Sequence, residues 1–383
     1  MNQNLERLHQ YPFERLNALL ADVTPNSTLD LIPLSLGEPK HRPPDFVLDF
    51  LADKKTLATH LATYPATRGV PELRAAIADW LSKRFSARVD PDTQVLPVNG
   101  TREALFSFAQ AVLPNSPNVN QTIPANASRR TSLPFVLTPN PFYQIYEGAA
   151  ILGGAKPRYI NNEPAQGYQQ DFSQMQSDDW AATQLVYICS PGNPTGQVMP
   201  EAQMIKLIEL SLEHNFIIAS DECYSEIYFD DRQPPNSLLA VSQAMGNIDY
   251  KNCIIFHSLS KRSNLPGLRS GFVAGDAQIL ENYLLYRTYH GCAMSAHHQY
   301  ASALAWQDEI HVEQNRDLYR QKFAIVEDIL RKHFAVHTPQ GGFYHWLPVG
   351  EDDALFARDL MRDQHVKVVP GQFLGRDSGA GNP

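Results

Sequence analysis

The sequence is short of the features that mark several common protein classes. Four cysteines occur among 383 residues and form no C-x-x-C pair, so neither a disulfide framework nor a structural zinc site is indicated. Asp and Glu (41) outnumber Lys and Arg (32), and the basic residues form no run, so the formal net charge of −9 argues against a nucleic-acid or anionic-membrane partner. No stretch approaches the ~18 apolar residues of a membrane span, and the charged N-terminus lacks a signal-peptide core. A cytoplasmic protein that acts on small molecules is expected.

Two catalytic signatures are also missing. No G-x-G-x-x-G motif follows the first strand-like segment, which argues against a dinucleotide-dependent dehydrogenase. His297 and His298 are adjacent but have no H-E-x-x-H setting, so no metal centre is predicted. The chain does have 43% hydrophobic residues, 16 Tyr and 18 Phe, a composition typical of a globular α/β enzyme of two or three domains.

Short apolar runs alternate with helical patterns through the middle of the chain. Residues 71–85 predict an amphipathic helix that begins at a proline, and residues 202–215 predict a crossover helix. This alternation is typical of a sheet whose ligand sites lie beyond the carboxyl ends of its strands. The predicted buried parallel strands are PFVLTP, LVYICS, FIIASD, CIIFHS and GFVAGD.

The remaining segments give weaker signals. Residues 6–20 have helical spacing and residues 25–44 are rich in proline, which together suggest an N-terminal arm. Residues 114–134 predict a long surface loop without an assigned function, and its Asn126 sequon is interpreted as chance. Residues 279–333 are again helical, and GGFYHWLPV and VKVVPG are predicted strands of a smaller C-terminal domain.

Four polar motifs follow one another along the chain, and three of them come directly after predicted strands. Each alone is ordinary, because a lone lysine is usually a solvated charge, an aspartate after a strand is often a helix N-cap, and Gly-Asn-Pro is a turn signal. Their combination in this order is specific. The motifs are NGTREAL from Asn99, SPGNPTG from Ser190, SDECY from Ser220 and SLSKRSNLPGLRSG from Ser258.

Together these motifs resemble the fold-type I pyridoxal-phosphate family, specifically the class I/II aminotransferases, over nearly the whole chain. The resemblance implies pyridoxal 5′-phosphate as cofactor and an α/β fold with a large domain on a mostly parallel seven-stranded sheet and a smaller α+β domain. Residues 1–60 are expected to form an N-terminal arm and part of the small domain. Residues 61–289 are expected to form the large domain, and residues 290–383 the C-terminal small domain.

The resemblance also implies a role for each residue of the lysine and aspartate motifs. Lys261 is expected to hold the cofactor as a Schiff base and later to carry the substrate proton. Burial behind the apolar CIIFH run independently favours a lowered pKa for this amine. Asp221 is expected to keep the pyridine nitrogen protonated, so that the ring withdraws electrons from the substrate Cα. Tyr224 and Asn193 are expected to donate hydrogen bonds to the phenolic oxygen, and these donors lower the pKa of the imine.

The cofactor phosphate needs positive charge and backbone donors, and the resemblance assigns them to two segments. One is the start of the helix that NGTREAL predicts, where N–H groups can meet an anion. The other is the SLSKRSNLPGLRSG segment, which contributes hydroxyl groups and a guanidinium that can form two hydrogen bonds. The expected phosphate ligands are Gly100, Thr101, Arg102, Ser258, Ser260 and Arg269.

Three further residues are carried over from the family pattern. Tyr143 is expected to stack on the cofactor ring, although an aromatic residue after a proline turn is often core packing. Tyr64 is expected to reach the phosphate of a neighbouring subunit, which implies a homodimer. The backbone of Gly37, together with Asn193, is expected to approach the substrate carboxylate.

The implied activity is transfer of an amino group between an L-amino acid and a 2-oxo acid such as 2-oxoglutarate. Within the family, the SDECYSEIYFDD and HSLSKRSNLPGLRSG runs look most like succinyldiaminopimelate transaminases of lysine biosynthesis. Aspartate, alanine and aromatic transaminases, and a carbon–sulfur lyase on the same fold, stay open. A transcription regulator is disfavoured, because the acidic chain leaves no room for a DNA-binding module before Gly37.

The end of the chain departs from the family pattern. Family members continue past a segment like VVPGQFLG into a strand that carries an arginine for the substrate α-carboxylate. Here the sequence ends at Pro383, so about 20 residues are expected to be absent, judged by ordinary element lengths. The distal part of the substrate is also unassigned, since Arg42, Arg68 and Arg262 could each face it or face water.

Overall fold

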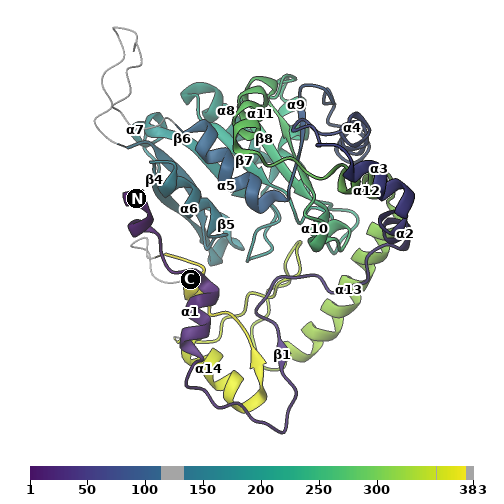
Figure 1. Ribbon diagram of the computed structural model, residues 1–383. Coiled ribbons are helices and arrows are strands. Elements are labelled where there is room, and N and C mark those ends of the chain that lie inside the picture. The colour runs from purple at the N-terminus through teal and green to yellow at the C-terminus, as the bar shows by residue number, and fades with distance from the viewer. Residues whose placement is uncertain (114–132, 351, 377–383) are drawn as a thin grey trace.

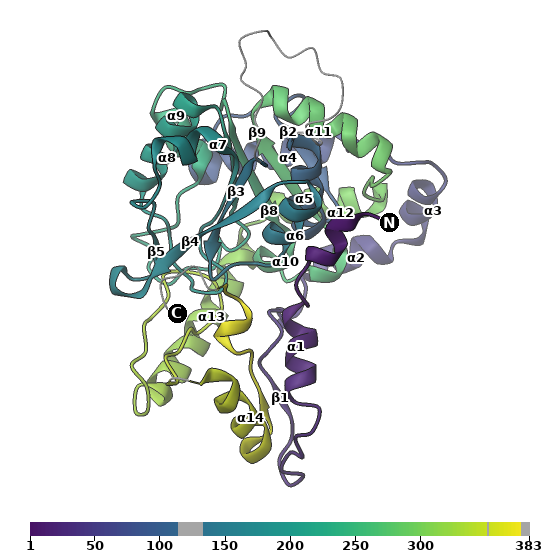
Figure 2. The same cartoon turned by 90° about the vertical axis from the view of Figure 1, so that its left-hand side faces the viewer.

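The computed structural model describes residues 1–113, 133–350 and 352–376. The surface loop expected at 114–134, with Asn126, lies outside these residues apart from its last two positions. In Figures 1 and 2 the chain forms a large upper body around a sheet and a smaller lower body of helices and short strands. We call these the large body and the small body.

The large body is built on a sheet that has eight strands in the described part of the chain, in the order β2-β9-β8-β7-β6-β3-β4-β5. Strands β8, β7, β6, β3 and β4 are parallel, whereas β9 is antiparallel to both of its neighbours. The mostly parallel sheet is as expected, with the two-residue β5 added to the expected seven strands. The GFVAGD run forms β9, so its prediction as a parallel strand was wrong. The strands are β2 (Val95–Val98), β3 (Phe135–Asn140), β4 (Lys156–Glu163), β5 (Gln169–Gln170), β6 (Thr183–Cys189), β7 (Ile217–Asp221), β8 (Cys253–Ser258) and β9 (Gly271–Gly275).

Helices cover both faces of this sheet, because successive strand residues point in opposite directions. In β8, Ile255 belongs to the core under α4, α8, α9 and α12, while Phe256 belongs to the core under α5, α6 and α11. The helices of the large body are α2 (Asp45–Ala52), α3 (Lys54–Leu61), α4 (Pro71–Phe85), α5 (Thr101–Val112), α6 (Ile145–Leu152), α7 (Ser177–Ala182), α8 (Glu201–His214), α9 (Leu238–Ala244), α10 (Leu259–Arg262), α11 (Ala277–His290) and α12 (Ala296–Gln307), with 3-10 turns η2 (Pro164–Gln166) and η3 (Pro266–Leu268).

Local signals explain where the helices begin and end. Helix α4 has the predicted bounds, with Pro71 in its first turn and Ser86 in a left-handed conformation at its end. The Asp276 side chain accepts hydrogen bonds from two backbone N–H groups at the start of α11, and Gly291 ends that helix with φ +78°. The helical stretch predicted over residues 279–333 is divided into α11, α12 and α13 (Ile310–Leu330).

The small body contains short elements from both ends of the chain. Strand β1 (Ile32–Pro33) pairs in parallel with β10 (Val366–Lys367), next to α1 (Pro12–Leu19) and α14 (Asp353–Gln364), and η4 (Gly371–Phe373) follows β10. The N-terminal helix predicted over residues 6–20 is in fact two elements, η1 (Gln3–Arg7) and α1, because Pro12 must lie in a first turn. The long helix α13 runs from the large body down to the small one (Figure 1).

The GGFYHWLPV segment is not a strand. Its only ladder contact in the described residues is a single bridge between Gly341 and Tyr228. Two of its aromatic residues, Phe343 and Tyr344, instead contact Tyr224 beyond the end of β7. The domain boundaries drawn from the sequence stay a prediction.

No helix in the described ranges is both long enough and apolar enough to cross a membrane.

Candidate active site

Most of the predicted site residues meet at one edge of the sheet, below the large body. Asp221 is the last residue of β7, Ser258 is the last residue of β8, and Asn193 follows the end of β6. Gly100 follows β2 and precedes α5. Since β6, β7 and β8 are parallel neighbours, their carboxyl ends bring these residues together.

Lys261 lies on the short helix α10, with its amine in this site. Its Nζ donates a hydrogen bond to the backbone carbonyl of Gly37. The same atom lies 5.0 Å from the ring centre of Phe343 and 5.9 Å from that of Tyr224. Burial of the side chain lowers the pKa of Lys261 to about 8, because an ammonium loses its hydration there. The amine can therefore be neutral, and so nucleophilic, near physiological pH.

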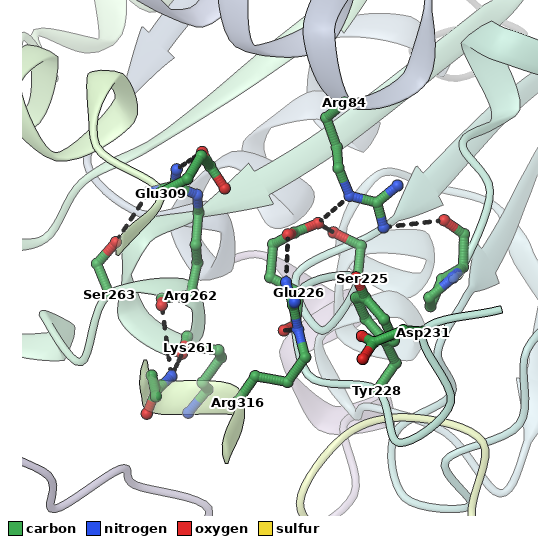
Figure 3. A network of polar contacts seen from close by, with 12 residues as sticks. Arg84, Ser225, Glu226, Tyr228, Asp231, Lys261, Arg262, Ser263, Glu309 and Arg316 are labelled. Atoms are coloured by element: carbon green, nitrogen blue, oxygen red, sulfur yellow. Dashed lines mark hydrogen bonds and ion pairs between the residues drawn. The ribbon is translucent and has the colours of Figure 1, made fainter. Parts of the chain in front are cut away.

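The backbone beneath Lys261 is held from two sides. The Nδ2 of Asn315 on α13 donates to the carbonyl oxygen of Lys261 at 3.1 Å. The next residue, Arg262, is 2% exposed, and its guanidinium carbon lies 5.4 Å from the Trp80 ring and 4.8 Å from the Trp306 ring. Figure 3 shows the Arg262 guanidinium directed away from the amine of Lys261. The backbone around Lys261 is held by these contacts, while its amine is bonded to the Gly37 carbonyl.

A contact with the N-terminal segment supports the same helix α13. The Asn315 amide has its Nδ2 engaged with Lys261, so its Oδ1 accepts from His41 Nδ1 at 2.8 Å. The other ring nitrogen of His41 lies 2.6 Å from Lys322 Nζ. His41 thereby ties the segment that carries Gly37 to the helix that holds Lys261.

Asp221 is 4% exposed and receives two hydrogen bonds. The hydroxyl of Tyr146 donates to its Oδ2 at 2.8 Å, and the backbone N–H of Cys223 donates to its Oδ1 at 3.2 Å. Burial raises the pKa of this carboxyl group. No Lys, Arg or His in the described ranges forms an ion pair with it, although a buried carboxylate is costly without a cation. This unpaired carboxylate fits a cationic pyridine ring.

Behind Asp221, a second buried carboxylate is fully paired. Glu222 Oε2 lies 3.0 Å from His257 Nε2, and its Oε1 accepts from the Ser220 hydroxyl and from the backbone N–H of Leu238, each at 2.9 Å. The sequence analysis did not single out Glu222 or His257. Their contacts hold the ends of β7 and β8 in place.

Tyr224 lies deep in the site against the GGFYHW segment. Its hydroxyl oxygen is 2.6 Å from that of Tyr344, and its ring meets Phe343 edge-on at 5.4 Å between centroids. Burial raises the pKa of Tyr224 well above its ordinary value, so it is a hydroxyl donor at neutral pH. Asn193 lines a neighbouring hollow with Thr195 and other polar residues.

The residues proposed for the phosphate form a cradle at the start of α5. Gly100 has φ +84°, and a Cβ at this position would collide with the guanidinium of Arg269. That guanidinium donates to the carbonyl oxygens of Pro266 at 2.9 Å and Asn99 at 3.4 Å. It therefore lies beside the unpaired N–H groups of a helix N-terminus, an arrangement that suits an anion.

The hydroxyl groups of the cradle are close to one another. Ser258 Oγ donates to Ser260 Oγ at 2.9 Å, and Thr101 Oγ1 lies 3.1 Å from Cys223 Sγ. With Arg269 they offer the hydroxyls and positive charge that a phosphate group requires.

Three predicted site residues lie differently from the rest. Arg102 points to the Tyr11 ring, 5.3 Å from its centre, rather than to Arg269. Tyr143 meets Tyr146 edge-on at 5.8 Å. Tyr64 is fully exposed, so the folded chain leaves it available to a neighbouring molecule.

The three arginines considered for the distal part of the substrate have other surroundings. Arg42 is exposed and pairs with Asp45 at 2.5 Å. Arg68 donates to the carbonyl oxygen of Asp92 at 2.5 Å. Arg262 is buried and ion-paired with Glu309, as Figure 3 shows, so it does not face a substrate.

A buried ion network adjoins the site and connects three segments (Figure 3). Glu226, on the loop after β7, accepts from Arg84 of α4 at 2.9 Å and from Arg316 of α13 at 3.2 Å. All three side chains are at least four-fifths buried. The network fixes the loop that carries Tyr224 against both helices.

One further cluster combines Glu103, His290 and Cys292, whose potential ligand atoms lie within 4.8 Å of one another. Arg287 forms an ion pair with Glu103 at 2.6 Å. Because this guanidinium already neutralises the carboxylate, the cluster is accounted for without a bound cation.

Comparison with known proteins agrees with this geometry. The family model for aminotransferase class I and II matches residues 30–380. An LL-diaminopimelate aminotransferase from Desulforudis audaxviator is 28% identical over 97% of this chain and 90% of its own length. The 4-dedimethylamino-4-oxo-anhydrotetracycline transaminase OxyQ from Streptomyces rimosus is 32% identical over 90% of this chain and 86% of its own.

Solved structures give the same result. An aminotransferase from Neisseria meningitidis Z2491 superposes with a TM-score of 0.91 at 45% identity, covering 100% of this chain and 93% of the other. Aminotransferase AspB from Helicobacter pylori 26695 superposes with a TM-score of 0.84 at 35% identity, covering 97% and 91%. The chain therefore belongs to the class I and II aminotransferases and is a pyridoxal-phosphate-dependent transaminase of fold type I.

Proposed function

We propose that this transaminase moves the amino group of a diaminopimelate-type donor, LL-2,6-diaminopimelate or its N-succinyl derivative, to 2-oxoglutarate in lysine biosynthesis. The observation that carries the chemistry is the buried amine of Lys261, with its pKa lowered to about 8, in the same site as the buried and unpaired carboxylate of Asp221. Two observations support the donor class. The motifs around Lys261 and Asp221 resemble those of succinyldiaminopimelate transaminases, and relatives of the chain are named LL-diaminopimelate aminotransferases.

The residues of the site fit pyridoxal phosphate in defined roles. When bound, the cofactor supplies an aldehyde for the lysine amine and a cationic ring that withdraws electrons from the substrate Cα. Asp221 would hold the proton on the ring nitrogen, and Tyr224 and Asn193 would donate to the phenolic oxygen. The phosphate would be held by Gly100, Thr101, Ser258, Ser260 and Arg269, and by Arg102 through its place in the first turn of α5, since its guanidinium lies at the Tyr11 ring. Tyr143 would cover the ring.

The substrate is handled by two groups of this chain. Lys261 would take up the proton of the substrate Cα at its Nζ and later give it back, and its four-carbon side chain gives the amine the reach to do so. Gly37 and Asn193 bind the substrate α-carboxylate. The aromatic rings of Tyr224 and Phe343 exclude water from the amine.

The donor can be identified by coupled assays across a panel of amino acids with 2-oxoglutarate. We expect kcat/KM to be highest for LL-2,6-diaminopimelate or N-succinyl-LL-2,6-diaminopimelate. A preference for aspartate, alanine or an aromatic amino acid would contradict the donor assignment. Pyruvate or ammonia release without keto-acid-dependent glutamate formation would point to a lyase instead.

The lowered pKa of Lys261 predicts how cofactor uptake depends on pH. Only the neutral amine attacks an aldehyde, so uptake by the apoprotein should rise about tenfold per pH unit below pH 8 and level off above it. Rapid-mixing absorbance measurements between pH 6 and 10 would follow this. A rise that continues to pH 10 would mean that the folded protein leaves the lysine pKa at its ordinary 10.5.

We also propose a homodimer in which Tyr64 reaches the phosphate of the neighbouring subunit. Its support is the complete exposure of Tyr64 beside another exposed apolar side chain, Leu61. The variants Lys261→Ala and Tyr64→Ala should each be nearly inactive alone. Mixed and refolded in equal amounts, they should recover about a quarter of the wild-type activity, because half of the dimers are hybrids with one intact site. No recovery, despite hybrids seen by native mass spectrometry, would show that each site is built from one chain.

A further inference from the structure

Tyr344 lies where three segments of the site meet, although no motif of the sequence pointed to it. Its hydroxyl oxygen is 2.6 Å from the hydroxyl oxygen of Tyr224. On its other side, the same hydroxyl fills the space that a Cβ at position 37 would need, so a side chain there would force Tyr344 to shift. The carbonyl oxygen of Gly37 accepts the hydrogen bond from Lys261. Tyr344 thus touches both the residue proposed to bind the phenolic oxygen and the residue that contacts the lysine amine.

The direction of the Tyr224–Tyr344 hydrogen bond follows from counting protons. Either hydroxyl can be the donor, but each has one proton. If Tyr224 gives its proton to the phenolic oxygen of the cofactor, its own oxygen must accept from Tyr344. The separation of 2.6 Å is at the short end for a bond between hydroxyl groups. A hydroxyl that accepts such a bond becomes a stronger donor itself.

We propose that Tyr344 is a positioning residue that acts through Tyr224: its hydroxyl donates to the Tyr224 oxygen, orients the Tyr224 proton towards the phenolic oxygen and strengthens that donation. The inference rests on the proposed function, because it assumes the cofactor roles of Lys261 and Tyr224. A purely structural role would leave Tyr344 as a packing residue, with its ring 4.8 Å from that of Phe343.

The test is a spectrophotometric pH titration of the cofactor bound to Lys261 in the holoenzyme. A donor to the phenolic oxygen withdraws charge from that oxygen and so lowers the pKa of the lysine-linked nitrogen next to it. In Tyr344→Phe the donation weakens, and this pKa should rise by about 0.5 to 1 unit, the size expected for one hydrogen bond. The variant removes a single buried oxygen and keeps the ring, so its thermal melting should confirm an intact fold.

Two further variants separate action through Tyr224 from a general effect. In the Tyr224→Phe background, adding Tyr344→Phe should produce no additional pKa shift. Tyr250→Phe is the matched control, because it removes a buried tyrosine hydroxyl that donates to the carbonyl oxygen of Arg88 at 2.7 Å. Tyr250 precedes the first residue of β8, whereas the site lies beyond the last one. This control should titrate like the wild type.

The proposal is overturned if Tyr344→Phe titrates like the wild type, or if its shift persists undiminished in the Tyr224→Phe background. Should Tyr344→Phe fail to hold the cofactor, 3,5-difluorotyrosine at position 344 keeps the hydroxyl and makes it a stronger donor. The pKa should then shift downwards, and an unchanged pKa would count against the proposal. A wild-type protein that binds no cofactor at all would refute the proposed function instead.

Discussion

Lys261→Ala is expected to lower transamination by about 10⁴-fold or more, because it removes both the nucleophilic amine and the group that moves the Cα proton. The contacts of Lys261 explain why no other group can substitute. Its Nζ is held at the carbonyl of Gly37, and its nearest aromatic neighbours, Phe343 and Tyr224, offer no second amine. The fold should survive, since Arg262 and Asn315 hold the backbone of α10 independently of the lysine side chain.

The measurement combines kinetics with chemistry at the lysine. Glutamate formation from 2-oxoglutarate gives the rate, and borohydride treatment followed by peptide mass spectrometry gives the site of cofactor attachment. The adduct should appear at position 261 in the wild type and be lost in Lys261→Ala. Lys251→Ala, at an exposed turn, is the matched control and should keep full activity. An adduct on another lysine would overturn the assignment.

Asp221→Asn is expected to lower activity by about 10² to 10⁴-fold, because a neutral amide cannot keep the ring nitrogen protonated. The amide can keep the local geometry, with its oxygen accepting from Cys223 N–H and its NH₂ group donating to the Tyr146 hydroxyl. The loss should therefore appear in kcat. Cofactor affinity should change little, because the phosphate cradle is unaltered. Asp221→Glu restores a carboxylate but not its position, and should recover part of the rate. Full activity in Asp221→Asn would remove Asp221 from the proposed mechanism.

The same substitution, which lowers activity, should raise the stability of the apoprotein. Burial raises the pKa of Asp221, so the loss of stability caused by its ionisation builds up as the pH rises from 3.8 to that raised pKa and is complete above it. Asparagine carries no charge at any pH, and the Asp221→Asn apoprotein should melt at a higher temperature than the wild type near neutral pH. The difference should shrink as the pH falls towards 3.8, the ordinary value for Asp, and it should be reduced when the cofactor is bound. Equal melting temperatures at neutral pH in the absence of cofactor would contradict this.

The sequence was informative where a local signal determines local structure. Pro71 and the apolar spacing behind it predicted α4, and the apolar run CIIFHS was correctly predicted as a strand of a covered sheet. The direction of β9 could not be read from its apolar residues, because strand direction depends on the connection. The segment between Ser258 and Gly271 holds only α10 and η3, and it returns the chain antiparallel beside β8. The GGFYHWLPV run was misread for a similar reason, since Phe343 and Tyr344 pack against Tyr224 in the site and not on a sheet face.

The site shows the same division. Asp221 and Ser258 end strands, and Lys261 follows one, so the family pattern and the strand predictions located them together. Contacts between distant segments left no trace in the sequence. Tyr224 and Tyr344 are 120 residues apart, and His41 and Asn315 are 274 residues apart. Tyr146 and Glu222 were missed although a signal was available, because Tyr146 follows Tyr143 by three positions and Glu222 lies inside the SDECY motif.

Asn315 and Arg262 hold the backbone around Lys261, and this has a consequence for repeated turnover. In each cycle Lys261 would release the cofactor and later bind it again. Because the backbone of Lys261 is held, this movement involves its four methylene groups. The entropy lost at each return is limited to the rotamers of one lysine, about 2 kcal/mol at most. Recapture should therefore be fast and only weakly sensitive to temperature, as expected for a step that involves no local unfolding.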